Sequence, residues 1–148
     1  MKTPISILLS NRPAQGAFGS SGQRCTATSR AVVVNDIADE FVERIAKRAG
    51  SMRIGDGMDP NTEMGPTVDE SQFKTVLKYI DIGREDGATL VCGGSRATGN
   101  GLDKGLFVNP TVFDHVTPDM RIAREEIFGP VLVCLAREEL RRSDAGCE

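Results

Sequence analysis

A buried strand followed at once by an amphipathic helix is the feature that most constrains the fold of this chain. Residues 30–34, "RAVVV", form a β-branched run of the kind that fills a buried strand. In residues 35–50, "NDIADEFVERIAKRAG", an apolar side chain recurs at every fourth position, which predicts a helix with one buried face. Asp36 is the expected N-cap, and Gly50 is the expected end of the helix. The apolar residues of the predicted face are Ile37, Phe41, Ile45 and Ala49.

The same alternation of helix and strand continues along the chain. Asp69, with Gln72 three residues later, predicts the start of a second helix, which we expect Gly83 and Gly87 to weaken or end. Three further apolar runs are bounded by turn residues and predict strands. They are "ATLVCGG" at 88–94, "LFVNPTVF" at 106–113 and "VLVCL" at 131–135. Strands that alternate with amphipathic helices indicate an α/β fold with a mostly parallel sheet and flanking helices.

Bulk properties exclude several classes of protein. The chain has 148 residues, which suits one domain. Its net charge is -3 and both signs are scattered, so we expect neither a nucleic acid nor an anionic membrane as partner. The longest apolar stretch, "ISILL" at residues 5–9, is far too short to span a membrane and is also short for the apolar core of a signal peptide. We therefore expect a cytoplasmic protein.

The cysteines do not form a metal-binding or disulfide pattern. Cys25, Cys92, Cys134 and Cys147 are widely and irregularly spaced, and the chain has one histidine. We therefore predict no metal site and no disulfide framework. Cys92 and Cys134 lie inside apolar runs, which is typical of packing groups.

Cys25 has a different setting, because it follows Arg24 and a run of Gly and Ser. A thiol attacks a carbonyl only as the thiolate, which positive charge and the N–H groups of a turn favour. Two interpretations stay open from these residues, a reactive nucleophile and a loop cysteine beside a strand. A cysteine hydrolase that pairs Cys25 with His115 is a further alternative, although "FDHVTPD" provides that histidine with no special setting.

Two stretches resemble the aldehyde dehydrogenase superfamily. Residues 18–30, "FGSSGQRCTATSR", resemble its cysteine signature, and residues 125–131, "EEIFGPV", resemble its cofactor-contact motif. "GPTVDESQFKTVLKYI" and "GLFVNPTVF" lie between them and resemble family segments in the family's order. The resemblance implies that residues 16–135 are part of the family's catalytic domain. Residues 1–15 and 136–148 do not share it and are expected to be an atypical extension and an atypical tail.

The resemblance also implies roles for particular residues. Cys25 matches the nucleophile, which would form a thiohemiacetal and then a thioester as a small-molecule aldehyde is oxidised to a carboxylic acid with NAD or NADP. Glu126 matches the residue that holds the nicotinamide ribose hydroxyls, and Phe128 the one that packs near the nicotinamide ring. Gln72 matches a further cofactor contact. Without the resemblance, the pair Glu125 and Glu126 would be interpreted as a solvated acidic end of a helix.

Other parts that the resemblance implies are absent from the sequence. No "ELGGK"-like motif with the general-base glutamate precedes Cys25, and neither does the asparagine that completes the family's oxyanion hole. We therefore expect a truncated form that is weakly active or inactive in isolation, binds NAD or NADP poorly and does not form the family's homo-oligomer. The alternative is a non-catalytic remnant that binds a partner through an exposed sheet edge.

Overall fold

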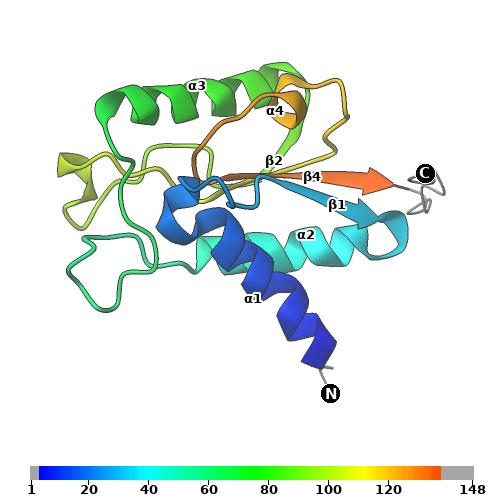
Figure 1. The fold of residues 1–148 in the computed structure, drawn as a ribbon, viewed down its shortest axis with the longest axis horizontal. Helices are drawn as coiled ribbons and strands as arrows, with labels where there is room; N and C mark the ends of the chain where they lie inside the picture. Colours follow the sequence, from blue (N-terminus) through cyan, green and yellow to red (C-terminus); the bar gives the residue numbers. More distant parts are fainter. Residues whose placement is uncertain (1–3, 138–148) are drawn as a thin grey trace, which may run out of the picture.

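The computed structural model describes residues 4–137 and has a four-stranded sheet at its centre (Figure 1). The strands are β1 (Arg30–Val34), β2 (Thr89–Cys92), β3 (Thr111–Asp114) and β4 (Val131–Arg137), in the order β1-β4-β3-β2. β4 pairs in parallel with both β1 and β3, whereas β2 pairs antiparallel with β3. The predicted α/β fold with a mostly parallel sheet is thus confirmed.

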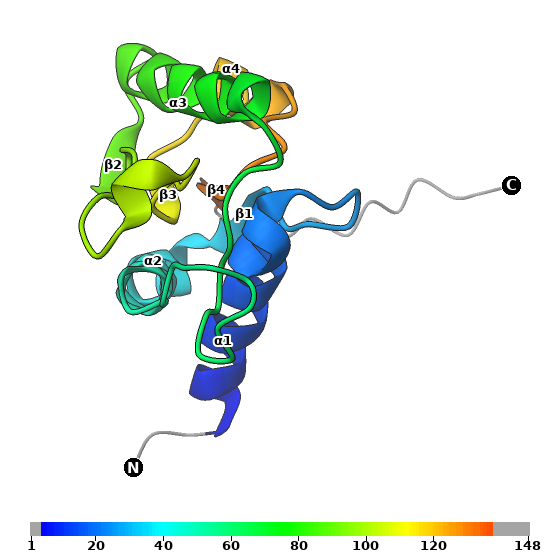
Figure 2. The same cartoon turned by 90° about the vertical axis from the view of Figure 1, so that its left-hand side faces the viewer.

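Helices cover both faces of this sheet (Figure 1, Figure 2). α1 (Pro4–Phe18) and α2 (Asn35–Gly50) lie on one face, and α3 (Glu70–Glu85) and α4 (Arg121–Arg124) lie on the other. Two short 3-10 helices, η1 (Gly19–Gly22) and η2 (Leu102–Lys104), lie in the connections. The three layers bring the C-terminal end of α1 close to the start of β4, which is where the candidate site forms.

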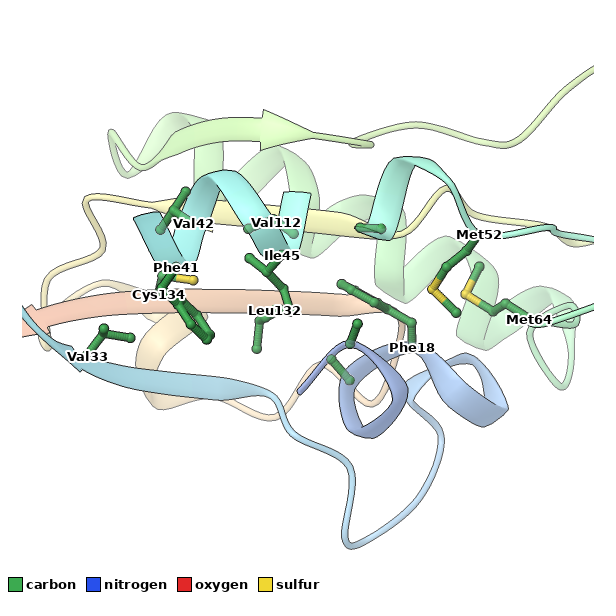
Figure 3. Close-up of a cluster of buried hydrophobic side chains, with 13 residues drawn as sticks. Phe18, Val33, Phe41, Val42, Ile45, Met52, Met64, Val112, Leu132 and Cys134 are labelled. Atoms are coloured by element: carbon green, nitrogen blue, oxygen red, sulfur yellow. The ribbon is translucent and has the colours of Figure 1, made fainter. Parts of the chain in front are cut away.

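The core between α1, α2 and the sheet contains fully buried large side chains (Figure 3). Phe18 at the end of α1, Ile45 of α2 and Leu132 of β4 have no exposed surface. α2 buries the predicted residues Phe41, Ile45 and Ala49, but Ile37 is 40% exposed and Val42 lies in the core instead. The predicted helix face is therefore correct except for its first turn.

The opposite face is built on α3, whose predicted start is confirmed. The carboxylate of Asp69 accepts a hydrogen bond from the backbone N–H of Gln72 at 2.8 Å, as an N-cap does. Of the two glycines expected to weaken or end the helix, Gly87, with a φ of 92°, lies just beyond its end, whereas Gly83 lies inside it. α3 continues to Glu85, and a Cβ at Gly83 would lie 2.9 Å from the ring of Phe113. The glycine is there because α3 packs closely on the sheet.

Two other features at helix starts differ from the sequence-based expectations. Asp36 is not the N-cap of α2, because Val34 occupies that position and no side chain caps the helix.

α1 was not predicted, because its sequence has no apolar period and contains Pro13. Its last turns are buried against the core through Ala14, Ala17 and Phe18. α1 runs through residue 15, where the atypical extension was expected to end.

Of the tail expected at 136–148, residues 136–137 end β4, and residues 138–148, which include Cys147, lie outside the described residues. Among the described residues, no helix has the length and apolar character needed to cross a membrane.

Candidate active site

The loop that carries Cys25 begins with a sharp reversal after α1. Ser20, Ser21 and Gly22 all have positive φ angles, of 57°, 56° and 68°. The backbone N–H of Ala27 then donates to the carbonyl of Arg24 at 3.0 Å, which closes a turn with Cys25 inside it. Cys25 is exposed, and neither its thiol nor its backbone N–H has a hydrogen-bond partner within residues 4–137. Both groups are therefore available to a ligand.

A second loop, residues 65–68, makes hydrogen bonds to this reversal. The hydroxyl of Ser21, which is buried, lies 2.8 Å from the carbonyl oxygen of Gly65 and 3.1 Å from that of Pro66. The side-chain oxygen of Gln23 accepts a hydrogen bond from the backbone N–H of Val68 at 3.0 Å. The exposed thiol is thus carried on a backbone that is held in place just before it.

The segment with the two acids lies against the Cys25 loop. A Cβ built at Gly22 would lie only 2.1 Å from the carbonyl oxygen of Gly129, so the two backbones touch. Cys25, Glu126 and Phe128 line one cavity of about 200 Å³ between these segments. Three of the four site residues predicted from the sequence therefore lie together, although they come from distant parts of the chain.

The two adjacent acids differ in their surroundings. The carboxylate of Glu125 accepts a hydrogen bond from the hydroxyl of Tyr79 at 2.7 Å and lies 3.1 Å from the guanidinium of Arg121. These hydrogen bonds, first from Arg121 and then from Tyr79, lower the pKa of Glu125. Glu126 is exposed on the cavity, and within the described residues its carboxylate has no partner. Glu126 is therefore the acid that can bind a ligand, whereas the carboxylate of Glu125 is already bound by Arg121 and Tyr79.

The pairing of Tyr79 with Glu125 can be tested by titration of the phenol. The hydrogen bond to the carboxylate raises the pKa of Tyr79 above its usual value of 10.0, because ionisation would place two negative charges together. Tyr79 is the single tyrosine and the chain has no tryptophan, so the ultraviolet absorbance of tyrosinate reports on this residue alone. We expect a midpoint above 10.0 that falls toward that value in Glu125→Gln.

Glu126→Gln is the matched control for this titration, because Glu126 makes no hydrogen bond with Tyr79. It should leave the midpoint unchanged, and equal shifts in both variants would contradict the assignment of Glu125 as the partner.

Gln72, the fourth predicted site residue, is placed differently. Its side-chain amide nitrogen donates to the carbonyl oxygens of Ile127 and Phe128, both at 2.9 Å, and it does not line the cavity. Phe128 has a φ of 54°, which is uncommon for a residue with a side chain. The contact made by Gln72 is therefore with the backbone that carries Phe128.

The other cysteines and the histidine lie away from this cavity. Burial raises the pKa of Cys134 to about 12 and also raises that of Cys92, in agreement with their predicted role in packing. His115 is exposed, with its Nδ1 3.1 Å from a carboxylate oxygen of Asp114, and it does not line the Cys25 cavity. The structure thus does not bring His115 to Cys25. Over residues 4–137, no cluster of three or more His, Cys, Asp and Glu side chains is placed to bind a metal.

Arg30 is a cavity residue that the sequence analysis did not single out. It lines the same cavity as Cys25 and hydrogen-bonds to the segment before Glu126. A second and larger cavity, of about 930 Å³, lies between residues 52–66 and 100–107 and shares no lining residue with the first. The predicted chemical groups therefore gather at the smaller cavity.

Comparison with known proteins gives an independent view of the chain. Residues 9–142 match the aldehyde dehydrogenase family. The chain is 48% identical over 141 residues to an alpha-ketoglutarate semialdehyde dehydrogenase of Haloferax volcanii, covering 90% of this chain and 29% of that protein. It is 52% identical over 120 residues to a betaine aldehyde dehydrogenase of Mesorhizobium japonicum, covering 81% of this chain and 25% of that protein.

A solved structure shares the fold. The betaine aldehyde dehydrogenase of Staphylococcus aureus in complex with NAD+ is similar with a TM-score of 0.85 and 36% sequence identity, over 87% of this chain and 26% of that one. The chain therefore spans about a quarter of the length of the relatives that it matches. Because the family match covers most of the sequence and the fold agrees with it, this chain belongs to the aldehyde dehydrogenase family.

Proposed function

We propose that this chain supplies the nucleophile and part of the nicotinamide cofactor site for the oxidation of an aldehyde to a carboxylic acid with NAD or NADP. One observation carries the proposal. Cys25 and Glu126 line the same cavity, and neither side chain has a partner within residues 4–137. This reaction requires a nucleophile and a cofactor-binding carboxylate on the same cavity, both without partners in the protein.

Cys25 would act through its sulfur atom. The thiolate attacks the carbonyl carbon of the aldehyde, a C–S bond forms, and the carbonyl electron pair moves to oxygen. The free backbone N–H of Cys25 can donate to that oxygen. Oxidation of this thiohemiacetal leaves a thioester on Cys25, and attack by water breaks the C–S bond and releases the carboxylic acid and the thiolate. When bound, the cofactor supplies the acceptor for the hydride that the aldehyde carbon loses.

The residues on the cavity fit a nicotinamide cofactor. The free carboxylate of Glu126 can accept two hydrogen bonds at once, which suits the paired hydroxyls of a ribose. Phe128 is 39% exposed on the same cavity and can pack against a flat ring. The Staphylococcus aureus relative was solved with NAD+. Because this chain spans about a quarter of such relatives, we propose that in isolation it binds the cofactor poorly and is weakly active or inactive.

The substrate is proposed at the level of a chemical class. Relatives of similar identity act, by their names, on alpha-ketoglutarate semialdehyde and on betaine aldehyde. Relatives named for such different aldehydes share this segment, so it carries the chemistry that is common to them. We therefore propose an aldehyde as the substrate and name no particular one.

Selective alkylation of Cys25 tests the proposal. In a Cys147→Ser background at about pH 8, the Cys134 thiol stays protonated, because burial raises its pKa to about 12. We expect iodoacetamide to modify Cys25 at least about 100-fold faster than Cys134, and also faster than Cys92, as measured by mass spectrometry of peptides over time. A small aldehyde should slow the alkylation of Cys25, since the thiohemiacetal ties up the thiolate.

Cys25→Ser should remove the fast phase and leave the slow modification of Cys92 unchanged. Alkylation of Cys92 at the rate of Cys25, or a rate at Cys25 that aldehydes do not change, would contradict the proposed chemistry. The second of these results would instead favour the non-catalytic, partner-binding alternative.

A further inference from the structure

Arg30 connects the two walls of the proposed site. It is the first residue of β1, it follows the Cys25 loop, and it lines the cavity. Its Nε donates to the carbonyl oxygen of Ala123, and its Nη2 donates to that of Glu125 at 2.7 Å. One guanidinium therefore joins the strand that leaves the nucleophile loop to the backbone immediately before Glu126.

The segment that Arg30 holds has little stability of its own. α4 has only four residues, and a helix of one turn leaves its last carbonyls without partners in the helix. Arg30 takes up two carbonyls at this end of α4, those of Ala123 and Glu125. The side chain of Glu125 is held from the other side by Tyr79 of α3. The residue before Glu126 is thus fixed through both its carbonyl and its carboxylate.

We propose that Arg30 is a positioning residue, which keeps Glu126 and Cys25 on one cavity by holding the two carbonyls before Glu126. The proposal rests on the proposed function of that cavity. It depends on the fork of the guanidinium, which donates from two nitrogens held in one plane, whereas the three donors of a lysine ammonium all rotate on one nitrogen. The positive charge alone is not sufficient.

Replacing Arg24 distinguishes the effect of the positive charge from that of the hydrogen-bonding fork within the same site. Arg24 also lines the cavity, but its side chain has no hydrogen-bond partner among the described residues. Removing Arg24 therefore takes the same charge from the cavity and breaks no connection between its walls.

Chemical bridging of the two walls tests the proposal. In the full chain with Cys147→Ser and Glu126→Cys, dibromobimane can bridge residues 25 and 126, and it fluoresces once both of its arms have reacted. Glu126→Cys leaves the acceptors of Arg30 in place, since these are the carbonyls of Ala123 and Glu125. The rate of bridging is divided by the rate at which iodoacetamide modifies Cys25, so that it reports proximity rather than thiol reactivity.

We expect Arg30→Met and Arg30→Lys each to slow bridging by about tenfold or more, since both lose the fork. Arg24→Met should leave the normalised rate within about twofold of its parent. Bridging at the parent rate in both Arg30 variants would overturn the positioning role. Full bridging in Arg30→Lys, or an equal loss in Arg24→Met, would overturn it as well, because the fork of Arg30 would then not be what holds the two walls.

Failure of the proposed function gives a different result, because an aldehyde would then not slow the alkylation of Cys25, whatever the rates of bridging in the Arg30 variants. Hydrogen exchange of the amides in α2 and β4 shows whether each variant is folded. If Arg30→Met does not fold, Arg30→Lys, which keeps the charge, carries the comparison.

Discussion

Replacing Gly22 with alanine is expected to lower the free energy of unfolding by about 3 kcal/mol, through a left-handed backbone conformation and steric overlap. Gly22 has a φ of 68°, which disfavours any residue with a side chain. The new Cβ would lie 2.1 Å from the carbonyl oxygen of Gly129 and 3.0 Å from that of Ala17. These contacts are with backbone atoms, which cannot move aside as the end of a side chain can. Urea denaturation followed by circular dichroism measures the change.

Gly57→Ala is the matched control, because a Cβ at Gly57 has no atom within 4 Å and its φ is not positive. It should change the stability by no more than about 0.5 kcal/mol, as an ordinary surface substitution does. If Gly22→Ala were as stable as Gly57→Ala, the close contact between the Cys25 loop and the segment after Phe128 would not exist as described.

Phe18→Ala should destabilise the chain by about 3–5 kcal/mol, the range for an aromatic side chain removed from a core. Phe18 has no exposed surface and packs between the end of α1 and the sheet, beside Leu132 and Met64 (Figure 3). It directly precedes η1, so its burial also fixes the point from which the chain turns toward Cys25. The free energy of unfolding from urea denaturation provides the measurement.

Phe128→Ala makes the same chemical deletion at a position that is 39% exposed. Less apolar surface is returned to water there and no closed cavity is left, so the loss should be less than about half as large. Equal losses in the two variants would show that Phe18 does not hold the end of α1 in the core.

Local patterns of residues were enough to predict most of the sheet and two of its helices. The run at 30–34 forms β1, the run at 131–135 lies in β4, and Asp69 caps α3. Each of these predictions depends on neighbours in sequence, because strand and helix periodicity and capping are set within a few residues. Local patterns did not predict α1, because its own sequence contains Pro13. This helix depends instead on the burial of its last turns, through Ala14, Ala17 and Phe18, against distant strands.

The site shows the same division. Cys25, Glu126 and Phe128 were predicted as site residues from the family motifs that they resemble, and their presence on one cavity is a property of the fold. The resemblance singled out Glu126 of the two acids, but no local pattern showed that the carboxylate of Glu125 is occupied, because its partner Tyr79 belongs to α3, far away in the sequence. In the same way, the carbonyls bound by Gln72 and Arg30 belong to segments that only the packing of α3 and β1 brings near.

The sequence by itself thus predicted most of the strands and helices, because these follow from residue types and short spacings, and its resemblance to the aldehyde dehydrogenase family predicted which residues carry the chemistry. The tertiary structure alone decided which of those side chains are left without a partner and turned toward the cavity. That choice depends on contacts between elements far apart in the chain, and no local pattern encodes such contacts.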